Sequence, residues 1–120
     1  MEVSADQATP ADTFDHTLGT GALSYSWWVR SVTNGSPVQP GWEVSLTCED
    51  GNGGTRTAAI SHETVLAAAR QVLAARPKYA SDALVRECGH LLYAADCTDF
   101  DAPAADELLQ FIVLGEIIFG

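Results

Sequence analysis

Basic side chains are scarce in this chain. Its 120 residues include six Lys and Arg against 16 Asp and Glu, which gives a formal net charge of −10 at pH 7. The shortage is uneven, because residues 1–29 and 87–120 contain no Lys or Arg. An acidic chain repels nucleic acid and anionic membranes and attracts basic partners. We therefore expect no direct binding to nucleic acid or membrane. If the negative charge does more than keep the protein soluble, we expect the partner to be a basic protein.

Cysteine is also sparse. Cys48, Cys88 and Cys97 form an odd set without C-x-x-C or H-x-x-x-H spacing, which gives neither a disulfide framework nor a zinc pattern. The start of the chain, MEVSADQATPADTFD, lacks the basic and apolar regions of a signal peptide. These features predict free thiols in a reducing compartment, so we expect a cytoplasmic protein.

Catalytic and ligand-binding motifs are missing as well. The sequence has no G-x-S-x-G and no glycine-rich loop that leads from a predicted strand into a helix. Ser61 and His62 are adjacent, but Ser61 fits a helix cap. The turn at residues 50–54 (DGNGG) has the composition of a calcium loop, yet position 61 is Ser where that loop requires an acid. We expect no enzyme activity, no metal and no cofactor.

One long apolar run is present, at residues 105–120 (ADELLQFIVLGEIIFG). It is shorter than the ~20 apolar residues that a membrane span needs, and two polar residues interrupt it. A helix that is apolar nearly all round has to be covered all round, so we expect this run to be the central element of the core. Gly115 leaves two endings open: the helix continues, or residues 116–119 form a short C-terminal strand, which the Ile-Ile pair favours slightly.

Alternating side chains predict a sheet. Residues 22–33, 42–49 and 55–60 read as strands, and turn-rich segments separate them, which predicts a three-stranded antiparallel meander. In the first strand the side chains expected to face the core are Leu23, Tyr25, Trp27 and Val29. In the second strand they are Trp42, Val44, Leu46 and Cys48.

Helical spacing follows from residue 61 onwards. Ser61, Ser81 and Asp101 are the predicted N-caps of three helices, and Pro77 prevents continuation of the first. Pro103 suits the first turn of the third helix. The predicted fold class is α+β: a three-stranded antiparallel meander packed against three helices.

The predicted single domain covers residues 19–120. Residues 1–18 lack apolar periodicity and are predicted to be a flexible acidic tail, in which Phe14 is a lone anchor. One shared core is expected to contain Trp27, Trp42, Val44, Leu46, Leu84, Leu91, Leu108, Phe111 and Ile112. The more solvated side chains are expected to be Ser24, Ser26, Glu43, Ser45 and Thr47.

Trp28 is the side chain singled out for function. Its predicted strand face carries hydroxyls and charges, so the ring is either covered by the N-terminal tail or offered to a partner. Tryptophan is enriched at binding hot spots. The acids between residues 96 and 107 form a second candidate surface. The candidate binding residues are therefore Trp28, Arg30, Asp96, Asp99, Asp101, Asp106 and Glu107.

A resemblance is carried by residues 79–120, which read YASDALVRECGHLLYAADCTDFDAPAADELLQFIVLGEIIFG, and by the Trp27-Trp28 pair and the EDGNGG turn. This pattern resembles small uncharacterised proteins of actinobacterial phages, over about residues 22–120. The resemblance implies a small intracellular phage-type protein, from the accessory genes that act on host factors, and hence the cytoplasm of the host cell. It carries over no functional residue.

The sequence thus predicts a small, acidic, non-enzymatic interaction protein that binds a host or phage protein. Two other hypotheses stay open. The acidity can imitate nucleic acid and inhibit a DNA- or RNA-binding protein, although the acids at 96–107 form one short cluster. The other hypothesis is a structural or assembly protein of a virion.

Overall fold

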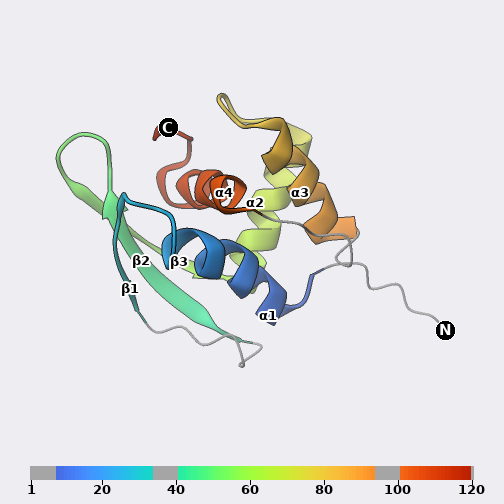
Figure 1. Cartoon of the computed structure of the whole chain (residues 1–120), viewed down its shortest axis with the longest axis horizontal. Coiled ribbons are helices and arrows are strands. Elements are labelled where there is room, and N and C mark those ends of the chain that lie inside the picture. The colour runs from blue at the N-terminus through green and yellow to red at the C-terminus, as the bar shows by residue number, and fades with distance from the viewer. Residues whose placement is uncertain (1–7, 34–40, 94–100, 120) are drawn as a thin grey trace.

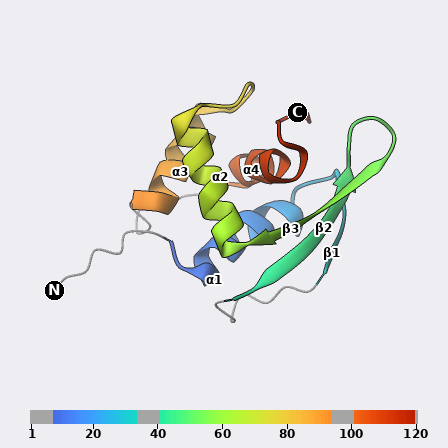
Figure 2. The same cartoon turned by 180° about the vertical axis from the view of Figure 1, so that it is seen from behind.

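The fold combines one antiparallel sheet with helices, as predicted for the α+β class. The computed structural model describes residues 8–33, 41–93 and 101–119. The strands are β1 (Val29–Thr33), β2 (Glu43–Glu49) and β3 (Thr55–Ser61), in the spatial order β1-β2-β3. The helical elements are α1 (Pro10–Thr13), the π-helical η1 (Phe14–Ala22), α2 (His62–Ala74), α3 (Asp82–Tyr93) and α4 (Ala102–Leu114). The sheet lies on one side of the molecule and α2, α3 and α4 gather on the other (Figures 1 and 2).

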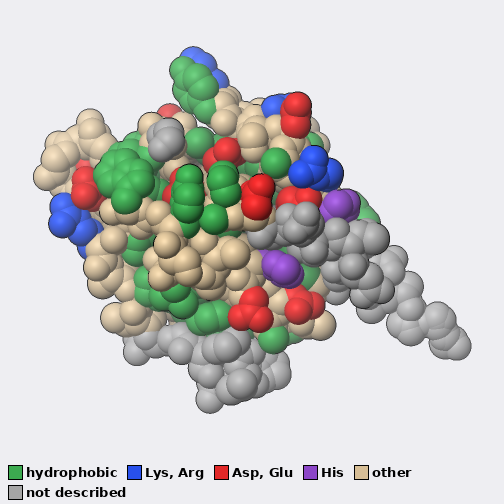
Figure 3. Space-filling model, in the orientation of Figure 1, with side chains coloured by type: hydrophobic (Ala, Val, Ile, Leu, Met, Phe, Trp, Pro, Cys, Tyr) green, Lys and Arg blue, Asp and Glu red, His purple; other side chains and the backbone are tan. Residues whose placement is uncertain are grey.

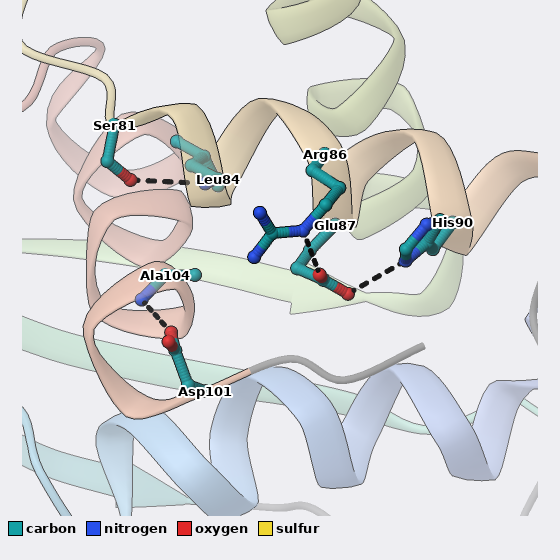
Figure 4. Close-up of polar contacts among 7 residues, drawn as sticks. All are labelled: Ser81, Leu84, Arg86, Glu87, His90, Asp101 and Ala104. Carbon is teal, nitrogen blue, oxygen red and sulfur yellow. Dashed lines mark hydrogen bonds and ion pairs between the residues drawn. The ribbon is translucent and has the colours of Figure 1, made fainter. Parts of the chain in front are cut away.

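The three predicted helices form where their caps place them. Ser61, Ser81 and Asp101 each accept a hydrogen bond from the backbone N–H three residues on, at 3.0–3.2 Å, and Figure 4 shows two of these caps. Gly115 ends α4 with a left-handed φ of 79°, a conformation that glycine adopts without strain. Residues 116–119 then follow without regular structure, so the short C-terminal strand is not formed.

The predicted register of β2 is confirmed. Trp42, Val44, Leu46 and Cys48 are buried and the residues between them are exposed or half-buried. The β2–β3 connection is a hairpin turn, as predicted. The Asp50 carboxylate accepts the backbone N–H groups of Asn52 and Gly54, and these hydrogen bonds lower the pKa of Asp50.

The predicted register before β1 is wrong. Trp28 is fully buried, whereas Trp27 is 62% exposed and Tyr25 is also exposed. Strand β1 begins only at Val29, and its pairing with β2 shifts between Val29 and Ser31. Residues 23–28 form turns and irregular structure and not a strand, so the two-residue alternation of a strand does not decide which of their side chains face the core. Ser26, expected to be solvated, is buried.

The flexible tail predicted for residues 1–18 is also wrong over its described part. Residues 8–18 lead into and form α1 and η1, while residues 1–7 lie outside the described residues. Phe14 and Leu18 are buried, and the Phe14 ring meets Trp42 edge-on with 5.2 Å between centroids. The rest of the buried stripe consists of Thr13, Thr17 and Gly21, which hydropathy does not mark as core.

Helix α4 is the central element, as expected. It contacts η1, α2, α3 and β3. Leu108, Leu109 and Val113 are buried, while Phe111 and Ile112, also predicted as core, are half-buried. A Cβ on Gly21 would lie 2.8 Å from a methyl group of Leu109, so η1 and α4 approach closely at this glycine. Among the described residues, the helices are all too short or too polar to cross a membrane.

Candidate docking surface and acidic pocket

A buried carboxylate on α4 explains why Trp28 turns inward. Asp106 is only 7% exposed. Its Oδ1 accepts hydrogen bonds from Ser26 Oγ at 2.6 Å and Trp28 Nε1 at 2.5 Å, and its Oδ2 accepts one from Gln110 Nε2 at 2.7 Å. A buried indole N–H needs an acceptor, and Asp106 supplies it from 78 residues further along the chain.

Gln110 lies one turn further along α4 and fixes the C-terminal segment, which we define as residues 116–119. Its Oε1 accepts the backbone N–H groups of Ile118 and Phe119 at 2.8 and 2.7 Å, and its Nε2 donates to Phe119 O at 3.1 Å. The Phe119 ring is stacked on Trp28, with centroids 5.8 Å apart, and meets Trp27 edge-on at 5.0 Å. Hydrogen bonds to its backbone and ring contacts of Phe119 therefore both hold the segment in place.

The outer side of this segment forms an apolar patch, the aromatic face, which we define as Tyr25, Trp27, Ile118 and Phe119. Tyr25, Trp27 and Ile118 are exposed, and Phe119 is half-buried between them and the core. Figure 3 shows hydrophobic side chains gathered on the side that carries the C-terminus, with acidic side chains beside them. Contiguous exposed apolar patches are a feature of interaction sites, whereas single exposed hydrophobic residues are ordinary.

A pocket of about 330 Å³ opens beside the aromatic face. Its lining residues come from the η1–β1 connection, the α2–α3 connection, the first half of α4 and the C-terminal segment: Tyr25, Tyr79, Pro103, Asp106, Glu107, Ile117, Ile118 and Phe119. Glu107 Oε1 accepts the backbone N–H of Ser81 at 2.8 Å, which joins two of these elements. Within the described residues, no Lys or Arg lines the pocket, and neither Asp106 nor Glu107 forms an ion pair.

The structure separates the predicted site residues. Trp28 is a core residue, so it offers no outer surface. Arg30 is exposed and forms an ion pair with Glu49 at 3.0 Å. Asp101 caps α4, whereas Asp106 and Glu107 lie at the pocket. The remaining two candidates, Asp96 and Asp99, lie outside the described residues.

Sequence reasoning missed the aromatic face and Tyr79. Its alternation assigned Tyr25 and Trp27 to the core, and the signal that could have corrected it was the indole N–H of one tryptophan needing a buried acceptor. Tyr79 sits in the α2–α3 connection with a positive φ of 71°, and Lys78 Nζ lies 5.2 Å from its ring centroid. Neither the positive φ of Tyr79 nor its contact with Lys78 produces a periodic pattern in the sequence.

A second buried acid, Glu87 on α3, has a structural role. Its carboxylate is 1% exposed and lies against Arg86 Nε at 3.0 Å and His90 Nδ1 at 3.1 Å (Figure 4).

Burial raises the pKa of the neighbouring Cys88 thiol to about 12, with a smaller contribution from the Glu87 charge. This thiol is therefore a poor nucleophile at neutral pH. No group of three potential metal ligands occurs in the part of the chain that the structure describes.

The comparisons with known proteins add no relative: no family model, no curated protein and no solved structure matches this chain. The resemblance to actinobacterial phage proteins therefore stays a prediction.

Proposed function

We propose that this chain is a small non-enzymatic interaction protein that binds another protein, of basic character, through the aromatic face. The observation that carries the proposal is Trp27, a ring that is 62% exposed although it packs edge-on against Phe119. Tryptophan and tyrosine are enriched among the residues that contribute most to protein binding. The proposal includes a phage-type accessory role, with a host or phage protein as the partner.

The rigidity of the aromatic face supports docking. Phe119 is clamped by Gln110 through three hydrogen bonds, one from its own N–H, one to its carbonyl and one from the neighbouring Ile118 N–H. Trp27 rests on that clamped ring. A surface that is already ordered loses little conformational entropy on binding, so more of its contact energy appears as affinity.

The distribution of charge supports a basic protein over nucleic-acid mimicry. A mimic needs a dense row of exposed acids. Of the described acids between 101 and 107, Asp106 is buried, Asp101 caps a helix and Glu107 holds the Ser81 backbone. The acidity of the whole chain, at −10, instead favours encounter with a basic protein surface, chiefly through the association rate.

A cytoplasmic location completes the proposal. Cys48 and Cys88 are free and buried, and burial raises the pKa of both thiols, so neither is set up for exchange with a disulfide. Unpaired cysteines of this kind suit a reducing compartment.

The test is capture of the partner from host lysate with three tagged proteins: the parent chain, Trp27→Ala and Tyr93→Ala. Tyr93 is a matched control because it is an aromatic residue on α3, 68% exposed and not in the pocket. We expect Trp27→Ala to weaken binding of the identified partner by about 2 kcal/mol or more in calorimetry, and Tyr93→Ala to leave it unchanged.

Equal affinity of the parent and Trp27→Ala would overturn the proposed docking surface. A partner that turns out to be a second copy of the chain, seen as a dimer in sedimentation, would replace the proposed hetero-partner. A nucleic-acid-binding enzyme that no longer binds its nucleic acid once captured would favour mimicry.

A further inference from the structure

The pocket beside the aromatic face holds two carboxylates without a cation. A carboxylate has about four acceptor positions. Asp106 uses three of them for neutral donors, Ser26, Trp28 and Gln110, and so keeps one position on Oδ2. Glu107 uses Oε1 for the Ser81 backbone, while its Oε2 accepts no hydrogen bond within the described residues. A largely buried charge without an opposite charge favours a cationic ligand over water alone.

The other walls of the pocket are rings and aliphatic side chains. Tyr25, Tyr79 and Phe119 supply aromatic surface, and Pro103 and Ile117 supply aliphatic surface. Lys78 Nζ lies 5.2 Å from the centroid of the Tyr79 ring and does not line the pocket. Carboxylates within an aromatic enclosure match a planar guanidinium, which stacks on rings and forms paired hydrogen bonds with carboxylates.

We propose that this pocket accepts an arginine side chain of the partner protein. The inference rests on the proposed function and names the chemistry that the docking surface recognises. The cavity of about 330 Å³ lies at the lower end of the 300–1,000 Å³ range for small-ligand pockets, which suits one long side chain. Tyr25, Ile118 and Phe119 belong both to the pocket and to the aromatic face. An apolar residue next to the arginine in the partner therefore reaches Trp27.

Peptide titration tests the chemistry directly. The probes are acetylated and amidated pentapeptides of sequence Ala-Leu-Xaa-Leu-Ala, in which Xaa is arginine, lysine or citrulline, the uncharged isostere of arginine. They are added to the ¹⁵N-labelled full chain. The reporters are the indole N–H resonance of Trp28, which bonds Asp106, and the backbone amides of Glu107 and Ile118. We expect saturable shifts with the arginine peptide at a Kd of about 1 mM or tighter.

Two variants with the same change of charge distinguish the effect of a charge in the pocket from the effect of the net charge on peptide binding. Glu107→Gln removes the charge at the pocket but keeps an oxygen for the Ser81 N–H, so the fold is retained. Glu43→Gln removes an exposed charge on β2, outside the pocket. We expect Glu107→Gln to raise the Kd of the arginine peptide at least about tenfold and Glu43→Gln to change this Kd less than about twofold.

The outcomes distinguish this inference from the proposed function. Equal binding of the citrulline or lysine peptide, or equal loss in the two variants, would overturn the assignment of arginine. So would the absence of shifts up to about 10 mM peptide. In each of these cases, loss of partner binding in the Trp27→Ala variant would still support the proposed docking surface. If Trp27→Ala does not change the affinity for the partner while the arginine peptide binds as expected, the arginine pocket is supported and the proposed docking surface is wrong.

Discussion

Adjacent tryptophans occupy opposite environments in this chain. Trp28 is fully buried beneath Phe119 and donates to Asp106, whereas Trp27 covers the same ring from the solvent side. The difference comes from the acceptor, since only one indole N–H reaches the carboxylate. At the residue scale, Trp28 is therefore a structural residue, whereas Trp27 is exposed and belongs to the proposed docking surface.

We predict that Trp28→Ala destabilises the protein by about 3–5 kcal/mol, because it leaves a large cavity and removes a donor from buried Asp106. Trp27→Ala should cost about 1 kcal/mol or less, since its ring is mostly in water. Urea unfolding followed by circular dichroism measures both. Equal unfolding midpoints for the two variants would show that the inward orientation of Trp28 is wrong.

Cys88 gives a prediction in pH. Its thiol is fully buried, and its pKa is raised from 9.0 to about 12. Below pH 9 the thiol is protonated in both the folded and unfolded chains. Above it the unfolded thiol ionises while the folded thiol keeps its proton, so the free energy of unfolding falls as the pH rises from about 9 to 12.

The measurement is the urea midpoint at pH 8, 9 and 10 for the parent chain and for Cys88→Ala. We expect the decline to be shallower in the variant, although its midpoint at pH 8 is lower through lost burial. Parallel declines in the two proteins would assign the pH effect to other groups.

At the scale of elements, local chemistry predicted most of the architecture. The β2 alternation and the caps at Ser61, Ser81 and Asp101 depend on neighbours within a few residues, so sequence patterns suffice for them. The burial of Trp28 depends on Asp106, far along the chain, and the stripe in η1 uses threonine and glycine. The candidate site was predicted in part: Asp106 and Glu107 were named, whereas Tyr25 and Trp27 were assigned to the core and Tyr79 was not identified.

The contact between η1 and α4 gives a paired prediction with glycines. A Cβ at Gly21 would lie 2.8 Å from Leu109 and 3.2 Å from Ala105, whereas a Cβ at Gly89 on α3 meets nothing within 4 Å. Gly21→Ala should cost about 1–3 kcal/mol by forcing the helices apart. Gly89→Ala should stabilise by about 0.5–1 kcal/mol, since alanine favours a helix interior. Thermal melting checks both, and a Gly21→Ala protein as stable as the parent would contradict the close approach.

At the scale of the whole molecule, the C-terminal segment closes the core. Ile117 is buried, Phe119 covers Trp28, and Gln110 holds the backbone of the segment, although Ile118, which the sequence reasoning also counted as buried, is exposed. The segment thus contributes through packing and through the hydrogen bonds to Gln110, and not through a strand.

We predict that removing residues 116–120 lowers stability by about 3 kcal/mol or more, of a total of about 5–15, because Ile117 and the cover of Trp28 are lost. Calorimetry measures the loss, and a chain that ends instead at Phe119 serves as the control because it keeps these contacts. A shortened chain that melts cooperatively at the parent temperature would contradict the closing role of the segment.

The long reach from Trp28 to Asp106 also has a consequence during synthesis. A ribosome adds about 5–20 residues per second, so roughly 5–20 s pass between the appearance of Trp28 and that of Phe119. During most of this time the nascent chain already carries η1 and Trp28 but lacks α4, which contacts η1 and supplies Asp106 to Trp28. Contacts so distant in sequence form late. The yield of folded protein in a cell should therefore depend on how well chaperones shield the first half of the nascent chain during those seconds.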